Sequence, residues 1–87
     1  MQCSVEITLY PIRDHYLEPI ESFIERLQGA ADIDVEVNAM STQVYGDFAT
    51  VMTAITAAMG PTLEALPGAF VLKVLGIDAR APHPRPD

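Results

Sequence analysis

The sequence predicts an α+β fold in which a four-stranded antiparallel sheet carries two helices on one face. Two observations predict it. Apolar and polar residues alternate in short segments, which is typical of half-buried strands, and in two longer segments apolar residues recur with the period of an amphipathic helix. These segments follow one another in the order strand, helix, strand, strand, helix, strand. A chain of 87 residues has the length of one domain, so we expect a single core.

Strands are expected at residues 4–10, 33–38, 41–46 and 69–77. In the first, "SVEITLY", apolar side chains alternate with polar ones, and the second, "IDVEVN", has the same pattern. A short connection separates the second from the third, so we expect these two to form a hairpin. The fourth, "AFVLKVLGI", is almost continuously apolar, which favours a central or well-covered strand.

Helices are expected at residues 17–28 and from residue 48 to the pair Gly60-Pro61. Asp47 suits the N-cap position of the second helix, and Gly60-Pro61 is a typical stop signal, after which "TLEAL" could add one short turn. The helical spacing gives each helix one apolar face, formed by Ile20, Phe23, Ile24 and Leu27 in the first and by Phe48, Met52, Ile55 and Met59 in the second.

This order of elements is the ferredoxin-like split βαβ arrangement. Right-handed crossovers place both helices on one face of the sheet and leave the other face open. The apolar strand residues are expected under the helices, and the open face is expected to carry Ser4, Glu6, Thr8, Glu36 and Asn38. Residues 1–78 are predicted to form the domain, and the Pro-rich residues 79–87 a mobile tail.

Composition excludes several classes of function. The 5 basic and 12 acidic residues give a formal net charge of −7, which makes binding to nucleic acid or to anionic membranes unfavourable. No apolar run has the length of a membrane span, and no basic region precedes an apolar one near the N-terminus. We therefore expect a cytoplasmic protein without a membrane segment. The one cysteine, Cys3, lies in the apolar phase of the first strand and is predicted to be a buried thiol.

Residues 38–47, "NAMSTQVYGD", form the candidate functional segment. It gathers neutral hydrogen-bonding side chains and contains one charged residue, Asp47. An ordinary turn uses Gly, Pro and Asp more heavily. The segment therefore has two interpretations: it shapes a hairpin, or it binds a ligand through uncharged polar groups.

Catalytic interpretations find little support in the residues. His15 and His83 are the only histidines, and neither has a partner at metal-ligand spacing, so we expect no metal and no cofactor. An acylphosphatase-like hydrolase would use Arg13 and Asn38, but the loop around Arg13 lacks the glycine that such a phosphate-binding loop needs. Glu6 and Glu36 share a sheet face and could act as acid and base, or simply face a ligand, a partner or solvent.

Two blocks of the sequence resemble a known family. The segments "EITLYPIRDHYLEPIESFIERL" and "VNAMSTQVYGDFATVM" are similar to the YkoF-related family of thiamine- and hydroxymethylpyrimidine-binding proteins, and more distantly to the broader thiamine-binding proteins. The resemblance runs from about Ser4 to Met59. It implies a ferredoxin-like fold and a non-enzymatic binding function linked to thiamine uptake or salvage. Fuller members of the family carry two such domains in tandem, so a homodimer or homotetramer is implied here.

The expected ligand is thiamine or its hydroxymethylpyrimidine part. An aminopyrimidine presents an amine donor and ring-nitrogen acceptors on one edge, which neutral amides, hydroxyls and a carboxylate can read, while an aromatic or Met side chain lies against the ring. The rival functions are an oligomerising regulatory or scaffold module that uses the open sheet face, and a small hydrolase. The predicted ligand-binding residues are Glu6, Tyr10, Asn38, Met40, Ser41, Thr42, Gln43 and Asp47.

Overall fold

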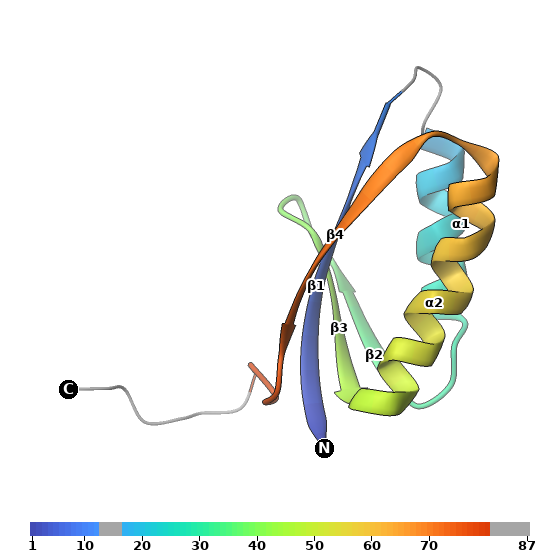
Figure 1. Cartoon of the computed structure of the whole chain (residues 1–87). Helices are drawn as coiled ribbons and strands as arrows, with labels where there is room; N and C mark the ends of the chain where they lie inside the picture. Colours follow the sequence, from blue (N-terminus) through green and yellow to red (C-terminus); the bar gives the residue numbers. More distant parts are fainter. Residues whose placement is uncertain (13–16, 81–87) are drawn as a thin grey trace.

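The computed structural model describes residues 1–12 and 17–80. Both helices pack on one face of the sheet, and the other face is open (Figure 1). The predicted α+β, ferredoxin-like fold is therefore confirmed. The elements follow the predicted order: β1 (Gln2–Pro11), α1 (Leu17–Gln28), β2 (Ile33–Val37), β3 (Thr42–Asp47), α2 (Phe48–Ala65) and β4 (Gly68–Leu75).

The strand order across the sheet is β2-β3-β1-β4, and every neighbouring pair is antiparallel. The register places Glu6 of β1 opposite Gln43 of β3 and opposite Lys73 of β4. Gln43 in turn lies opposite Glu36 of β2. Because residues that face one another across a ladder point to the same side, these four side chains form one row across the open face.

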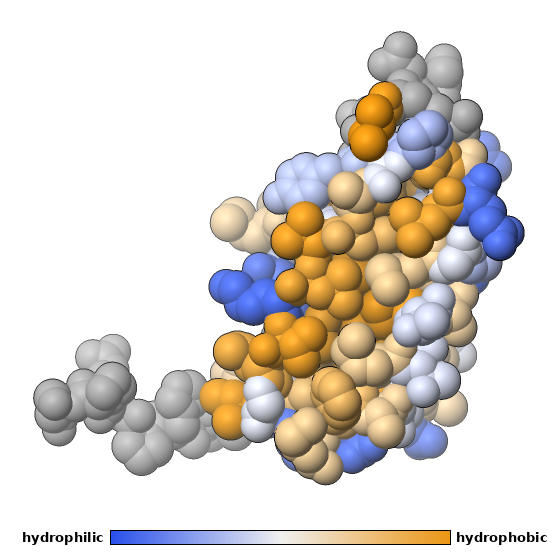
Figure 2. Space-filling model, viewed as in Figure 1, coloured by the Kyte–Doolittle hydropathy of each residue, from blue (hydrophilic) through white to orange (hydrophobic). Residues whose placement is uncertain are grey.

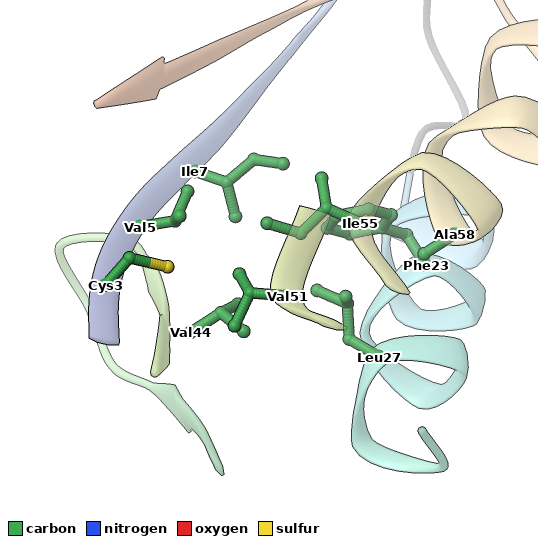
Figure 3. Packing of buried hydrophobic residues seen from close by; sticks show 9 residues of the cluster. All are labelled: Cys3, Val5, Ile7, Phe23, Leu27, Val44, Val51, Ile55 and Ala58. Carbon is green, nitrogen blue, oxygen red and sulfur yellow. The ribbon is translucent and has the colours of Figure 1, made fainter. Parts of the chain in front are cut away.

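The core lies between the sheet and the helices (Figure 3). The ring of Phe23 on α1 lies 4.9 Å from that of Phe70 on β4, which closes the core on the β4 side. Gly46 has a φ of 155° and faces α2, where an added Cβ would lie 3.2 Å from Val51, so the close approach of β3 to α2 requires a glycine. The buried cluster consists of Cys3, Val5, Ile7, Phe23, Leu27, Val44, Val51, Ile55 and Ala58.

Helix α2 differs from its prediction in two ways. Its buried stripe runs through Val51, Ile55, Ala58 and Thr62. Of the other predicted face residues, Met52 and Met59 are partly buried against the core, whereas Phe48 is 39% exposed. The helix also continues past Gly60-Pro61 to Ala65, so the predicted end was wrong.

The side chain of Arg26 joins α1 to the turn of α2 that contains Pro61. Proline has no N–H, so Pro61 removes the helical donor of the carbonyl four residues earlier, that of Ala57. From α1, Arg26 donates to the Ala58 carbonyl through Nε at 3.2 Å and Nη2 at 2.9 Å. Its Nη2 also donates to the Thr62 hydroxyl at 2.6 Å. These hydrogen bonds reach Ala58 and Thr62, not Ala57, and they hold α1 against α2.

Strand β4 is an edge strand, which corrects the expectation of a central or well-covered one. Alternate residues such as Phe70 and Leu72 pack against the core, but Val71, Val74 and Leu75 are 56%, 44% and 42% exposed. Figure 2 shows apolar side chains gathered along this side of the molecule, between β4 and α2. The continuous apolar run therefore marks an apolar edge of the sheet.

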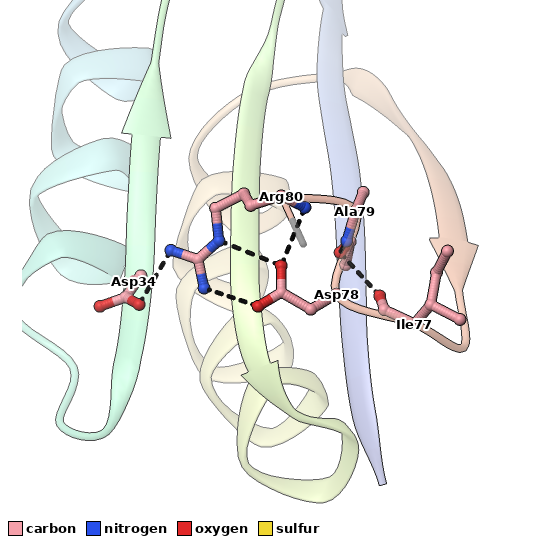
Figure 4. A network of polar contacts seen from close by, with 6 residues as sticks. Asp34, Ile77, Asp78, Ala79 and Arg80 are labelled. Atoms are coloured by element: carbon pink, nitrogen blue, oxygen red, sulfur yellow. Dashed lines mark hydrogen bonds and ion pairs between the residues drawn. The ribbon is translucent and has the colours of Figure 1, made fainter. Parts of the chain in front are cut away.

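The chain after β4 folds back across the open face of the sheet. The Ser4 hydroxyl donates to the Ile77 carbonyl and accepts from the Ala79 amide, both at 2.8 Å. Figure 4 shows the Arg80 side chain crossing β3 to reach Asp34 on β2. Ala79 and Arg80 are thus tied to the sheet, and the predicted mobile tail starts too early at residue 79. The rest of that tail, 81–87, lies outside the described residues.

Among the described residues, no helix combines the length and the hydropathy that crossing a bilayer requires.

Candidate functional site

A chain of hydrogen bonds links the β2–β3 turn to the centre of the sheet. The Asn38 amide donates from Nδ2 to Gln43 Oε1 at 2.9 Å, and Gln43 Nε2 donates to Ser41 Oγ at 2.5 Å. Ser41 Oγ donates to Glu6 Oε2 at 3.0 Å. An ionised carboxylate only accepts, so Ser41 must donate to Glu6 and accept from Gln43. This requirement fixes the orientation of the Gln43 amide, with its oxygen toward Asn38.

Asn38 also forms the turn itself. Its Oδ1 accepts the backbone N–H groups of Met40 at 2.9 Å and Ser41 at 3.1 Å, and its own N–H donates to the Ser41 carbonyl at 3.2 Å. An asparagine that binds the backbone two and three residues on is a standard way to close a tight turn. The segment 38–47 therefore shapes the hairpin and also orients polar groups on the sheet.

Some donors and acceptors of this chain of hydrogen bonds remain available. Within residues 1–12 and 17–80, Glu6 Oε1 and the second N–H of Gln43 have no hydrogen-bond partner. Gln43 is only partly exposed, whereas Glu6 is exposed to solvent. An acceptor and a donor thus lie side by side on β1 and β3 in fixed orientations, which is the pattern that a ligand with a complementary edge can pair with.

A hollow of about 170 Å³ lies beside these groups. Pockets for drug-sized ligands usually measure about 300–1,000 Å³, so this hollow fits a single small ring rather than a larger molecule. Apolar side chains and polar groups both contribute to its wall. It is lined by Ser4, Val5, Glu6, Gln43, Tyr45, Lys73, Leu75 and Ala79.

A larger hollow of about 410 Å³ lies between the ends of α1 and α2. Two of its polar lining residues, Arg26 and Thr62, already bind one another and serve to join the helices. At the smaller hollow on the sheet, neighbouring hydrogen bonds fix the orientation of an acceptor on Glu6 and a donor on Gln43. We therefore place the candidate site on the sheet.

The open face carries more negative than positive charge. Burial raises the pKa of the Tyr45 phenol, and the nearby carboxylate of Glu36 raises it further, while Arg80 acts in the opposite direction. The hydrogen bonds from Arg80 hold the pKa of Asp78 below its usual value. With Glu6 and Asp34 on the same face, the field here favours a cationic or amine-bearing ligand.

Four of the eight predicted site residues come together in the structure. Glu6, Asn38, Ser41 and Gln43 form the chain of hydrogen bonds described above. Each was expected from the neutral polar composition of the 38–47 segment or from the alternation of β1.

The other four predicted site residues lie elsewhere. Thr42 faces the helices, opposite Ile7, and is buried there, because it is one residue from Gln43 and strand side chains alternate. Met40 is 87% exposed at the turn. Tyr10 is on the open face, four residues further along β1 than Glu6. Asp47 lies at the N-cap of α2, where the N-terminal ammonium binds its carboxylate at 3.1 Å and lowers its pKa.

The structure also brings in residues that the sequence did not single out. The hollow is lined by Lys73 and Leu75 of β4 and by Ala79. Ala79 belongs to residues 76–80, which follow β4 and fold back across the sheet; we call them the returning segment. Lys73 is the one polar residue within an apolar run, and that interruption was the signal available for it. Nothing in the local sequence marks Ala79 or Arg80, because their place depends on how the chain returns across the sheet.

Two further features of the described residues concern metal binding and thiol chemistry. Among these residues, no group of three His, Cys, Asp or Glu residues could hold a metal ion. His15, His83 and Arg13 lie outside the described residues, so the hydrolase interpretation based on Arg13 is not addressed. Cys3 is fully buried, and burial raises the pKa of its thiol, which disfavours the reactive thiolate.

Comparison with known proteins shows similarity in fold. No family model matches the sequence, and no curated protein sequence does. Protein SP2199 from Streptococcus pneumoniae shares 17% identity with a TM-score of 0.82, over 93% of this chain and 92% of that one. A Thermotoga maritima protein provisionally assigned to thiamine biosynthesis or salvage shares 21% identity with a TM-score of 0.74, over 85% and 82%. A DUF77 domain of unknown function from Bacillus cereus shares 19% identity with a TM-score of 0.72, over 91% and 79%.

Proposed function

We propose that this protein binds thiamine or its hydroxymethylpyrimidine part, without catalysing a reaction, at the Glu6–Gln43 site. The observation that carries the proposal is the chain of hydrogen bonds from Asn38 through Gln43 and Ser41 to Glu6. Among the residues that the structure describes, it leaves one carboxylate oxygen and one amide N–H unpaired beside a ring-sized hollow.

The chemistry of an aminopyrimidine fits this pair of groups. Its exocyclic amine can donate to Glu6 Oε1, and a ring nitrogen can accept from the free N–H of Gln43. Both protein groups are held in place by their other hydrogen bonds, so little side-chain freedom is lost on binding. An analogue without the amine would leave the Glu6 acceptor unpaired and bind more weakly.

We propose further that the chain is a member of the thiamine-binding proteins, among which the YkoF-related family is the one it resembles. Two independent observations support this. The blocks around Glu6–Pro11 and Asn38–Asp47 carry the family resemblance. The fold is shared with the Thermotoga maritima protein that is provisionally linked to thiamine biosynthesis or salvage. On this proposal, the protein acts in thiamine uptake or salvage inside the cytoplasm.

A homodimer or homotetramer is the proposed assembly. Strand β4 is an edge of eight residues without proline, and its exposed Val71, Val74 and Leu75 are apolar. A long apolar edge strand readily pairs with another strand. Mass measurement by light scattering should find more than one subunit, and Val74→Lys should reduce the measured mass. A monomeric wild-type protein would contradict the assembly.

The same edge supports the rival function, an oligomerising scaffold module. In that case the apolar β4 edge forms the contact between subunits, and the hydrogen bonds from Asn38 to Glu6 on the open face only shape the hairpin. The two functions differ in one result: a scaffold assembles but binds neither thiamine nor hydroxymethylpyrimidine.

Calorimetric titration with thiamine and with hydroxymethylpyrimidine tests the proposal. We expect saturable binding by the wild type and about tenfold weaker binding by Gln43→Ala, because the variant loses a hydrogen bond worth about 1–1.5 kcal/mol to the ligand. Met40→Ala is the matched control, since its exposed side chain lies in the same turn and makes no side-chain hydrogen bond in the described structure. Absence of heat with both ligands at millimolar concentration would contradict the proposal.

A further inference from the structure

The guanidinium of Arg80 occupies a small site of its own on the open face. Its carbon lies 4.1 Å from the centre of the Tyr45 ring. Nε and Nη2 donate to the two carboxylate oxygens of Asp78 at 3.1 and 3.2 Å, and Nη1 donates to Asp34 at 3.0 Å. A flat cation is therefore held against an aromatic face and between two carboxylates.

Most of this site belongs to the sheet and not to the segment that supplies Arg80. Asp34 and Tyr45 lie opposite one another on β2 and β3, so both side chains are on the open face whether or not Arg80 is present. Glu36 is on the same face one step along β2, and its charge acts on Tyr45. Without Arg80, the sheet would present an aromatic ring flanked by carboxylates, which is the composition of sites that bind organic cations.

The site adjoins the hollow next to Glu6 and Gln43. Tyr45 and Ala79 line that hollow, and Tyr45 also carries the Arg80 guanidinium on its ring. A ligand with two linked rings could therefore place a neutral ring in the hollow and a flat cationic ring over Tyr45. Thiamine is such a molecule, because its aminopyrimidine is joined to a cationic thiazolium.

We infer that Tyr45, Asp34 and Asp78 form a subsite for a flat organic cation, and that Arg80 fills it in the free protein until the cationic ring of a ligand displaces it. The inference rests on the proposed function only in placing the neutral ring in the hollow. The subsite for the cationic ring is argued from the contacts of Arg80.

The anchoring of the returning segment allows this exchange. The segment is tied to β1 by the two hydrogen bonds of Ser4, to Ile77 and to Ala79, and neither involves the Arg80 side chain. The Arg80 guanidinium can therefore leave Tyr45 while the backbone stays in place. Its ion pairs with Asp34 and Asp78 must both break, and both are open to solvent, with 69% and 30% of the two acidic side chains accessible, which limits their strength.

Binding of a simple cation that lacks the pyrimidine tests the inference. N-methylthiazolium is titrated into wild-type protein and into Arg80→Ala, with the Tyr45 ring resonances as the readout. While Arg80 occupies the subsite, the ligand cannot enter it, so the apparent affinity for N-methylthiazolium falls with the fraction of protein in which the subsite is filled. Removing Arg80 should therefore strengthen binding by about five- to tenfold. In the wild type, the same titration should shift the Arg80 Nε–Hε resonance as the side chain is displaced.

Two comparisons make the result decisive. Repeating both titrations at about 0.5 M salt screens the general effect of removing one positive charge, and the gain in Arg80→Ala over the wild type should persist. Equal or weaker binding by Arg80→Ala, or a gain that disappears at high salt, would overturn the inference. If Arg80→Ala loses the native circular dichroism spectrum, Arg80→Gln carries the same prediction, since it also removes the charge.

Hydroxymethylpyrimidine separates this inference from the proposed function. It is neutral, so its affinity should be the same in the wild type and in Arg80→Ala. If it binds to neither while N-methylthiazolium binds more tightly to Arg80→Ala, the proposed function fails and the cation subsite stands. If it binds to both while N-methylthiazolium gains nothing, the cation subsite fails and the proposed function stands.

Discussion

Ser41 donates a hydrogen bond of 3.0 Å to Glu6, a residue 35 positions earlier in the chain. The contact joins the β2–β3 turn to β1 and is exposed to solvent. It also determines the direction of the hydrogen bond that Ser41 accepts from Gln43. The position of this contact, beside the hollow and away from the core, indicates a role in recognition more than in stability.

Ser41→Ala should therefore weaken ligand binding without destabilising the fold. The variant leaves the Gln43 amide held by Asn38 alone and removes the hydrogen bond that Glu6 accepts from Ser41. We expect about tenfold weaker binding of hydroxymethylpyrimidine and a change of at most about 0.5 kcal/mol in the free energy of unfolding, since exposed sites tolerate substitution. Urea unfolding and calorimetry measure the two quantities. A large loss of stability with unchanged affinity would assign Ser41 to the hairpin alone.

Arg26→Ala should destabilise the protein, because Arg26 supplies the contacts to α2 around Pro61. It donates to the Ala58 carbonyl and to the buried Thr62 hydroxyl. Loss of these hydrogen bonds should lower the free energy of unfolding by about 1–3 kcal/mol. Arg26→Lys can replace one donor but not the planar pair, so its free energy of unfolding should lie between those of the wild type and Arg26→Ala. If Arg26→Ala matches the wild type in urea, these hydrogen bonds between the two helices contribute nothing to stability.

Ile55→Ala should be among the most damaging single changes in α2. Ile55 is fully buried between the sheet and α1, and shortening it leaves a cavity. We expect a loss of about 2–5 kcal/mol in the free energy of unfolding. Leu63→Ala is the control on the same helix, because Leu63 is 48% exposed and its truncation should cost less than about 1 kcal/mol. Similar losses for both would contradict the observed burial.

Tyr45 should make the stability depend on alkaline pH. Burial raises the pKa of its phenol in the folded protein, so the unfolded chain loses that proton first as the pH rises. The stability that Tyr45 contributes is fully present below the phenol pKa of the unfolded chain, near 10. It is lost as the pH rises through the higher pKa of the folded protein. The urea midpoint of the wild type should therefore fall relative to that of Tyr45→Phe above about pH 10. The other two tyrosines are present in both proteins, and parallel midpoints at all pH values would contradict the prediction.

Cys3 should react with a thiol reagent only when the protein opens. It is fully buried, and burial raises its pKa. At pH 8, labelling of native protein by Ellman's reagent should be slow and should accelerate sharply in unfolding concentrations of urea. Rapid labelling of native protein would contradict the burial of β1 beneath the helices.

The fold and half of the predicted site residues could be predicted from the sequence. Period-two alternation placed Glu6 on the open face and Val5 in the core, and the neutral polar run placed Asn38, Ser41 and Gln43 near the β2–β3 turn. These predictions rest on side-chain direction along a single strand, which local sequence determines.

The remaining features depend on contacts between distant segments. Thr42 was grouped with its neighbours by composition, but the register turns it toward the helices. The apolar run of β4 has the same composition whether the strand is central or at an edge. Arg80 reaches Tyr45 only because the chain returns across the sheet, and Arg26 reaches Thr62 only because α1 packs beside α2.

The central claim is that the open sheet face around Glu6 and Gln43 binds the pyrimidine. Titration of ¹⁵N-labelled protein with hydroxymethylpyrimidine tests it most directly, with the side-chain amides of Gln43 and Asn38 as the reporters. The account predicts saturable shifts of these resonances and of the backbone amides of residues 41–45, with α1 and α2 unaffected. Unchanged Gln43 and Asn38 resonances at millimolar ligand, or shifts confined to the hollow between the helix ends, would contradict it.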